Sequence, residues 1–413
     1  MTGQAIIITT GDELITGSVL DTNSAAIAEQ LSGIGIDITA ILKVGDNSTR
    51  LHWALCQARD LSDLIIGTGG LGPKANDLSA EVVAKFLGGK LLRNELVAHS
   101  AEHPVDDRGL GGSRTHLQHA RFPEGSVVIP NPVGTVAGFR VSLEPNKSLI
   151  WLPGVPREMM TMLRATVLPW ILQQRTDAPE VSSCSFKIHG LTASGLDELL
   201  KSLSLPRGAK LSFRADFPDL LLRLTVKGKE ERAAAFALLK SQIEERLAPC
   251  IYAEGEKTLE EVVGEILLKK HETLALAESC TGGYISHRIT RVPGSSVYYY
   301  GGAVTYSNEA KMLYLGVKPQ TLQQHGAVSR ETALEMSAGV RDRLAASIGL
   351  SVTGIAGPSG GTVDKPVGTV WISIARSDLH EARRFSFDGD RERVIVGTAQ
   401  AALDWLRISL SKH

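Results

Sequence analysis

The feature that most constrains the fold is a regular alternation of strand-like and helix-like patterns over residues 5–88. Short apolar runs rich in isoleucine, such as AIIIT and DITAILKV, alternate with longer runs whose apolar residues recur at helical spacing. Strands that alternate with helices form a parallel sheet with helices on both faces. The sequence therefore predicts an α/β domain. Its predicted strands are 5–9, 37–44, 63–68, 126–130 and 148–153, and its predicted helices are 22–31, 48–60, 77–88 and 156–174.

Two further segments follow this domain. Residues 182–247 combine strand-like runs with a charged, alanine-rich helix, which predicts a small α+β module without a recognisable catalytic cluster. A third segment opens with the amphipathic helix LEEVVGEILLKK and ends with a long helix at 393–410. A chain of 413 residues exceeds one ordinary core, and we expect three domains. Their predicted bounds are 1–172, 178–255 and 258–413.

Charge and cysteine content exclude some classes of protein. The 44 basic and 45 acidic residues nearly cancel, so the overall charge gives no reason to expect nucleic acid or a membrane surface as a partner. The first residues lack the basic flank and apolar length of a signal peptide, and a cytoplasmic protein is expected. The four cysteines lack CxxC spacing, so we expect free thiols rather than zinc or disulfides.

The stretch LALAESCTGG, residues 274–283, holds the densest chemical signal. A predicted strand at 273–277 runs into a turn and then a helix from about Thr281. A hydroxyl at such a turn lies beside the unpaired N–H groups of a helix N-terminus, which can stabilise an oxyanion. This pattern makes Ser279 a candidate nucleophile, with the amides of Cys280 and Thr281 as oxyanion donors. The same pattern also fits a serine that only caps the helix.

A serine nucleophile needs a base. His271, His287 and His325 lie in or beside helix-like runs without a partnering carboxylate pattern. Lys311 lies in the first turn of a helix that Ser307 or Asn308 can cap in YSNEAK. The positive end of the helix and partial burial would lower the pKa of this lysine, making it a usable base. Taken alone, however, the segment fits a solvated surface lysine better.

A glycine-rich loop at 353–361 lies between two strand-like runs, with Lys365 close by in the sequence. Exposed N–H groups of such a loop can bind phosphate or carboxylate. A plain hairpin connection has the same composition, so the loop is a weak signal when taken alone.

Taken together, these segments resemble the CinA family, competence/damage-inducible protein A. The matching stretches are AESCTGG, PGSS, GGAVTYSNEAK, LGV, HGAVS, VTGIAGPSGG, KPVGTVW and FSFDGDR, and the resemblance covers essentially all of residues 258–410. It implies the nicotinamide-nucleotide amidohydrolase activity of the family's C-terminal domain, which converts nicotinamide mononucleotide (NMN) to nicotinate mononucleotide and ammonia. It also implies a Ser279/Lys311 pair, no metal or other cofactor for this step, and a homodimer.

We expect Tyr306 to orient Lys311, and the substrate phosphate to lie near the glycine-rich loop and Arg391. Arg391 could equally be a surface ion-pair partner. The residues expected to bind substrate are Thr353, Gly354, Gly357, Gly360, Lys365 and Arg391.

The N-terminal segment resembles the family's first domain, which is similar to molybdopterin-binding folds, over roughly residues 4–170. The matching stretches are TTGDELITGSVLDTN, GTGGLGP, NPVGT and LPGVPREM. In some members this domain is associated with metal-dependent ADP-ribose pyrophosphatase activity. The candidate phosphate or divalent-cation residues here are Asp12, Glu13, Asp21, Gly69, Gly70, Gly72 and Asp77.

This domain departs from the family pattern. The family reads GGLGP-Thr-x-Asp-Asp, whereas this chain has Lys74, Ala75 and Asn76 before Asp77. A polar interval at 99–119 also replaces a helical segment. Losing one carboxylate weakens a Mg²⁺-type site. We therefore expect the first domain to be degenerate and kept for folding or oligomerisation, in preference to an active pyrophosphatase. For the whole chain, the alternative to an amidohydrolase is a non-enzymatic nucleotide-binding regulator linked to competence or DNA damage.

Overall fold

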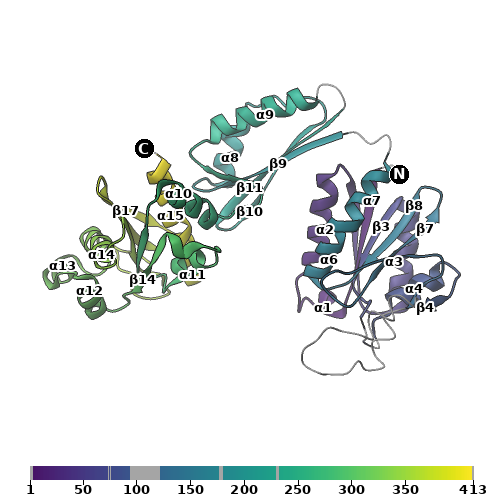
Figure 1. Cartoon of the computed structure of the whole chain (residues 1–413), viewed down its shortest axis with the longest axis horizontal. Coiled ribbons are helices and arrows are strands. Elements are labelled where there is room, and N and C mark those ends of the chain that lie inside the picture. Colours follow the sequence, from purple (N-terminus) through teal and green to yellow (C-terminus); the bar gives the residue numbers. More distant parts are fainter. Residues whose placement is uncertain are drawn as a thin grey trace. The chain divides into compact units, whose positions relative to one another are not determined.

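The computed structural model describes residues 3–72, 74, 76–93, 121–175, 180–228 and 232–411. The chain divides into two compact units, Met1–Ser182 with Lys227–Arg232 and Ser183–Val226 with Ala233–His413. The predicted α+β module and the C-terminal domain fall largely in the second unit, and each has its own sheet (Figure 1). The polar interval predicted at 99–119 lies outside the described residues.

A six-stranded sheet forms the centre of the first unit, in the order β2-β1-β3-β8-β7-β6. The strands are β1(Gln4–Thr10), β2(Asp37–Val44), β3(Leu64–Thr68), β6(Val127–Ile129), β7(Gly138–Glu144) and β8(Lys147–Leu152). The predicted parallel sheet is confirmed for β2, β1, β3 and β8, whereas β7 and β6 are antiparallel. Strand β7 was not predicted, because the charged Arg140 and Glu144 interrupt its apolar pattern.

Helices cover both faces of this sheet, as the alternation predicted. Along β1, Ile6 and Ile8 belong to one core and Ala5 and Ile7 to the other, which explains why this strand is apolar throughout. The first core includes residues of α3(Ser48–Leu61) and α4(Ser79–Phe86). The second includes residues of α2(Thr22–Gly33) and of the continuous run α6(Pro156–Met162), η2(Leu163–Val167) and α7(Leu168–Gln174). The short elements α1(Asp12–Ile15), β4(Leu91–Arg93) and β5(Arg121–Pro123) complete the described part.

The middle module, residues 180–255, is the α+β unit that the sequence predicted. Its sheet has the order β10-β11-β9-β12. The elements are β9(Glu180–Ile188), α8(Ala193–Leu200), β10(Ala209–Asp216), β11(Asp219–Gly228), α9(Arg232–Leu247) and β12(Ile251–Glu254). Alternate residues of β11 are buried, and Leu222 and Leu224 share a core with Leu239 and Ile243 of α9. One face of the sheet is therefore covered by helix.

The C-terminal domain has a five-stranded sheet in the order β14-β13-β15-β16-β17, with β14, β13 and β15 parallel. Its strands are β13(Leu274–Glu278), β14(Tyr299–Val304), β15(Ile348–Gly354), β16(Thr369–Ala375) and β17(His380–Ser386). Its helices are α10(Leu259–Lys270), α11(Tyr284–Thr290), η3(Ser295–Val297), α12(Asn308–Leu315), α13(Pro319–His325), α14(Arg330–Arg343) and α15(Arg391–Ser411).

The two faces of β13 differ in side-chain size. Leu274 and Leu276 enter the large core that contains residues of α10, α11 and α15, whereas Ala275 and Ala277 pack with residues of α12 and α14. The carboxyl end of β13 thus lies between two helical layers, at the edge of a parallel sheet where ligands commonly bind. No helix in the described part of the chain is long and apolar enough to span a membrane.

Candidate active site

Ser279 follows β13 directly and is buried, with its backbone N–H donating to Val352 O at 3.1 Å. The helix after it begins at Tyr284, so the prediction of a helix from about Thr281 is wrong by three residues. Gly282 and Gly283 have φ values of 60° and 97°, a left-handed conformation that cannot belong to an α-helix. Ser279 therefore lies in a turn before the helix and does not cap it.

Glu278 occupies the helix N-terminus that the sequence analysis had left free. Its buried carboxylate accepts hydrogen bonds from the backbone N–H groups of Gly283, Ile285 and Ser286 at 2.8–3.1 Å, and from Ser286 Oγ at 2.6 Å. These α11 amides are not available to an oxyanion. The expected donors, the amides of Cys280 and Thr281, precede them in the turn, where Cys280 lines the cavity beside Ser279 and Thr281 does not.

Lys311 lies beside Ser279, as the resemblance implied. Ser307 caps α12 by accepting a hydrogen bond from Ala310 N, which confirms the predicted cap. Only 1% of Lys311 is exposed, so this residue is not a surface lysine. Its Nζ lies 3.1 Å from Ser279 Oγ and donates to Thr305 O at 2.7 Å. Burial lowers the pKa of Lys311, and the nearby Cys280 opposes that shift.

Three hydrogen-bond acceptors surround Lys311 Nζ. Two backbone carbonyls face Lys311 Nζ, Thr305 O at 2.7 Å and Tyr306 O at 3.4 Å. With Ser279 Oγ as the third acceptor at 3.1 Å, these carbonyls match the three hydrogens of an ammonium; after loss of one proton, the amine keeps two hydrogens for the carbonyls and gains a lone pair that can accept the Ser279 proton. The Tyr306 phenol, which was expected to orient Lys311, instead accepts a hydrogen bond from Arg391 Nη2 at 2.8 Å. Sequence reasoning missed Thr305, because a backbone carbonyl leaves no side-chain signal.

Cys280 is buried beside this pair. Burial raises the pKa of its thiol to about 12, so the thiol is protonated near neutral pH. A protonated thiol is a poor nucleophile, so Ser279 and not its neighbour Cys280 is the candidate nucleophile.

A cavity of about 190 Å³ adjoins the Ser279–Lys311 pair. Its lining residues are Ser279, Cys280, Tyr306, Lys311, Ala327, Val328, Thr353, Gly354, Ala356 and Arg391. Arg391 is held at its edge by Nη1–H donation to Gly357 O at 2.7 Å and by its bond to Tyr306. The lining residues Ala327 and Val328 were not predicted, although the stretch HGAVS contains them, and Ala356 was covered only as part of the loop at 353–361.

The predicted substrate residues divide into two groups. Thr353, Gly354 and Arg391 line the cavity. Gly357 is not a lining residue, but its carbonyl accepts a hydrogen bond from Arg391. Gly360 and Lys365 are not among the lining residues, and the Lys365 ammonium donates to His325 O at 2.8 Å. The prediction that Lys365 lies in the site is therefore wrong in this structure, because a nearby carbonyl already binds its amine.

The first unit has a separate cleft of about 380 Å³ at the carboxyl ends of its parallel strands. Of the predicted residues, Glu13, Asp21, Gly69, Gly70, Gly72 and Asp77 line this cleft. Asp12 is not among the lining residues, and its Oδ1 accepts from Asp46 N at 3.0 Å. Asp21 caps α2 by accepting from Ser24 N, and Asp77 accepts from Lys74 N at 2.8 Å. These carboxylates each serve a local structural contact.

The acidic residues of the cleft do not form a preassembled cluster of metal ligands in the described part of the chain. Within the described ranges, no three His, Cys, Asp or Glu side chains form a group that could hold a metal. Asp46, which the sequence analysis missed, accepts from Asn76 Nδ2 at 2.9 Å and from Thr10 Oγ1 at 3.1 Å. If position 76 also held an acid, its carboxylate and that of Asp46 would repel each other unless a cation lay between them. The neutral Asn76 amide donates a hydrogen bond to Asp46 instead, so this pair requires no cation.

Fold and sites together define an α/β protein with a molybdopterin-binding-like N-terminal domain and a C-terminal α/β domain that carries a buried serine–lysine pair. Residues 6–173 match the family model described as "Probable molybdopterin binding domain", and residues 256–410 match the CinA C-terminal domain. The chain belongs to the CinA family, since its relatives align over nearly the whole length.

Among those relatives, a competence-damage inducible protein of Clostridium perfringens is 40% identical, with 99% of each chain covered. A CinA-like protein of Geotalea uraniireducens is 39% identical, covering 96% of this chain and 95% of the relative. The solved structure of the competence damage-inducible protein A of Klebsiella pneumoniae is 35% identical, covers 38% of this chain and 99% of that one, and has a TM-score of 0.36.

Proposed function

We propose that the C-terminal domain hydrolyses the carboxamide of NMN to give nicotinate mononucleotide and ammonia. The observation that carries the proposal is Lys311 Nζ, buried beside a cavity and 3.1 Å from Ser279 Oγ. A serine hydroxyl within hydrogen-bond reach of a base is the arrangement that nucleophilic acyl transfer requires. The choice of NMN rests on the family resemblance of AESCTGG and YSNEAK.

In the proposed mechanism, Ser279 Oγ attacks the carboxamide carbon while Lys311 takes the hydroxyl proton. The amide of Cys280, the expected donor that lines the cavity, stabilises the tetrahedral oxyanion. The C–N bond then breaks, and Lys311 returns the proton to the departing ammonia. A water molecule then attacks the resulting ester and gives its proton to Lys311. The ester C–O bond breaks, Lys311 passes the proton to Ser279 Oγ, and nicotinate mononucleotide leaves.

The charge state of Lys311 supports this substrate. Burial lowers the pKa of Lys311, so a larger share of the amine is neutral than for an exposed lysine at the same pH. A neutral amine can accept the Ser279 proton. It also imposes no like-charge repulsion on the cationic pyridinium ring of NMN.

Arg391 is the proposed partner of the 5′-phosphate. Its guanidinium is partly fixed by Gly357 O and the Tyr306 hydroxyl at the cavity edge. A planar guanidinium that keeps further N–H donors suits a phosphate group. Arg391 is thus assigned to substrate binding, with Thr353 and Gly354 lining the same cavity.

The test is ammonia release from NMN by the purified full chain. Ser279→Ala should abolish release, whereas Cys280→Ala, its immediate neighbour, should remain active because its thiol is protonated. Retained turnover in Ser279→Ala would reject the assignment. NMN binding by the wild type without any turnover would favour the non-enzymatic regulator.

We also propose that the first unit does not act as a metal-dependent ADP-ribose pyrophosphatase. The bond from Asn76 Nδ2 to Asp46 and the absence of a metal-binding group among the described residues support this view. Incubation of the full chain with ADP-ribose and a divalent cation should yield no AMP. AMP formation that depends on the cation would contradict the proposal.

A further inference from the structure

Helix α15 presents three polar side chains on one stripe. Arg393, Gln400 and Arg407 are spaced seven residues apart, which is about two helical turns. All three contact the middle module. Arg393 lies over the Phe217 ring at 4.1 Å, Gln400 Nε2 donates to Asp219 Oδ1 at 2.5 Å, and Arg407 Nη2 donates to Pro249 O at 3.0 Å.

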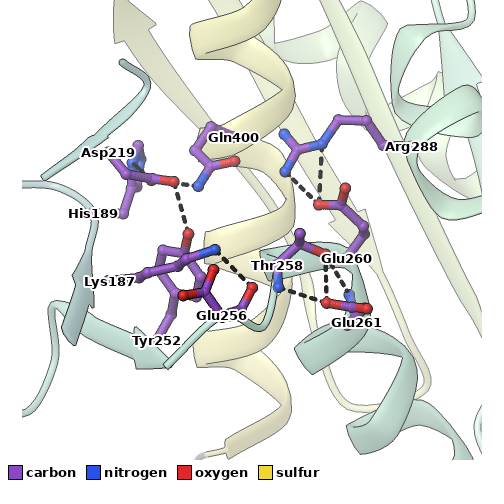
Figure 2. A network of polar contacts seen from close by, with 10 residues as sticks. All are labelled: Lys187, His189, Asp219, Tyr252, Glu256, Thr258, Glu260, Glu261, Arg288 and Gln400. Carbon is purple, nitrogen blue, oxygen red and sulfur yellow. Dashed lines mark hydrogen bonds and ion pairs between the residues drawn. The ribbon is translucent and has the colours of Figure 1, made fainter. Parts of the chain in front are cut away.

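Asp219 is the central contact of this stripe. Its second carboxylate oxygen accepts from the Tyr252 hydroxyl at 2.7 Å, so Asp219 joins Tyr252 to Gln400 (Figure 2). Figure 2 also shows Lys187, whose ammonium donates to Glu256 O at 2.9 Å where the module meets the C-terminal domain. The middle module is thereby attached to α15 along most of its length.

Arg393 is two residues from the proposed phosphate-binding Arg391, in the first turn of the same helix. Its backbone N–H donates to Asp390 Oδ1 at 2.9 Å, and its side chain lies against Gly389, where an added Cβ would lie 2.7 Å from Arg393 Cδ. Arg393, although exposed, therefore contacts both Phe217 of the middle module and Gly389 just before α15. A cation in a first helical turn is disfavoured by the helix dipole, and the face of an aromatic ring offsets that effect.

We propose that Phe217, at the tip of the β10–β11 hairpin, is a positioning residue for substrate binding. It holds Arg393 and with it the start of α15, and so presents Arg391 to the anionic end of the substrate. Phe217 does not touch the cavity, whose lining residues all come from the C-terminal domain. This inference rests on the proposed NMN hydrolysis, and it gives the middle module a role in substrate affinity.

The main experiment compares Phe217→Ala with Phe213→Ala in the full chain. Phe213 lies on the same hairpin and is 41% exposed, close to the 46% of Phe217, which makes it a matched control. Phe217→Ala should raise KM for NMN about twofold to fivefold, as expected for the loss of one exposed cation–π contact, and leave kcat unchanged. Phe217→Tyr should restore KM, and Phe213→Ala should match the wild type.

A merely structural role predicts a different outcome, because partial unfolding lowers kcat and leaves KM unchanged. A double-mutant cycle adds a second criterion: in an Arg391→Ala background, Phe217→Ala should raise KM no further. Additive effects on KM, or a fall in kcat alone, would overturn the proposal.

Hydrogen exchange separates this inference from the proposed reaction. In Phe217→Ala the amides of residues 391–395 should exchange faster than in the wild type, and those of 400–410 should keep their protection. If the wild type released no ammonia, the proposed NMN hydrolysis would be rejected. The exchange rates of residues 391–395 would still show whether Phe217 holds the start of α15 in place. Unchanged exchange at 391–395 would refute it.

Discussion

Gly339 of α14 controls how closely α14 approaches α12, the helix that carries Lys311. A Cβ added at Gly339 would lie 1.9 Å from Leu315 O and 2.8 Å from Leu315 C. Since real Cβ atoms essentially never approach closer than 3.0 Å, Gly339→Ala must separate the two helices by about 1.1 Å. Backbone on both sides leaves no flexible side chain to absorb this change.

The expected loss is in kcat. The Lys311 Nζ–Ser279 Oγ distance is 3.1 Å, and a misplacement of about 1 Å lowers the rate on the order of 100-fold. Overpacking should also lower stability by about 1–3 kcal/mol, partly offset by the better helix propensity of alanine.

The assay is ammonia release from NMN at saturating substrate, with thermal unfolding measured in parallel. Gly33→Ala is the control, because Gly33 ends a helix and an added Cβ there meets no atom within 4 Å. A Gly339→Ala protein with native kcat and native melting temperature would refute the steric argument.

Three further predictions concern charge. Because burial holds the pKa of Lys311 below 10.5, kcat should rise with pH through that lowered pKa and level off before 10.5; a kcat that still rises with pH above 10.5 would exclude Lys311 as the base. The free energy of unfolding should rise as the pH increases from the lowered pKa of Lys311 to 10.5. Within that window the unfolded chain binds a proton at Lys311 that the folded chain does not. Lys311→Met should remove this pH dependence, as measured by urea titration. Glu278→Gln should destabilise the fold by about 1–3 kcal/mol and lower kcat, because an amide group would face backbone N–H donors of α11. The exposed Glu265→Gln is its control in thermal unfolding, and equal melting temperatures for the two variants would contradict this role.

Much of the fold follows from local patterns. The strand 37–44 and the helix 259–270 have the bounds that apolar spacing predicted, because each carries its full periodic pattern and a clear start. Thr258 and Glu261 form a capping box at that helix, a signal contained in four consecutive residues. The start of α11 could not be found in this way, because Gly282 and Gly283 are compatible with helical and left-handed backbone alike.

The site was predictable only in part. Its two reacting groups, Ser279 and Lys311, came from a turn pattern and a family resemblance, while the structure brings them within 3.1 Å. The roles of Tyr306 and Lys365 differed from expectation, since each depends on a partner distant in sequence: Arg391 for Tyr306 and the His325 carbonyl for Lys365. Contacts made through backbone carbonyls depend on where the chain runs, and no residue type signals them.

The two faces of β13 differ in side-chain size, and this difference determines how freely the residues packed on each face can be substituted. On the face with Leu274 and Leu276, apolar side chains of similar volume can replace one another with small changes in packing. On the other face, glycines of α14 and β15 bring backbone atoms so close that an added methyl group at Gly339 or Gly349 would lie within 2.0 Å of a carbonyl oxygen. Selection for activity in a random library should therefore leave the first face variable and the second almost invariant.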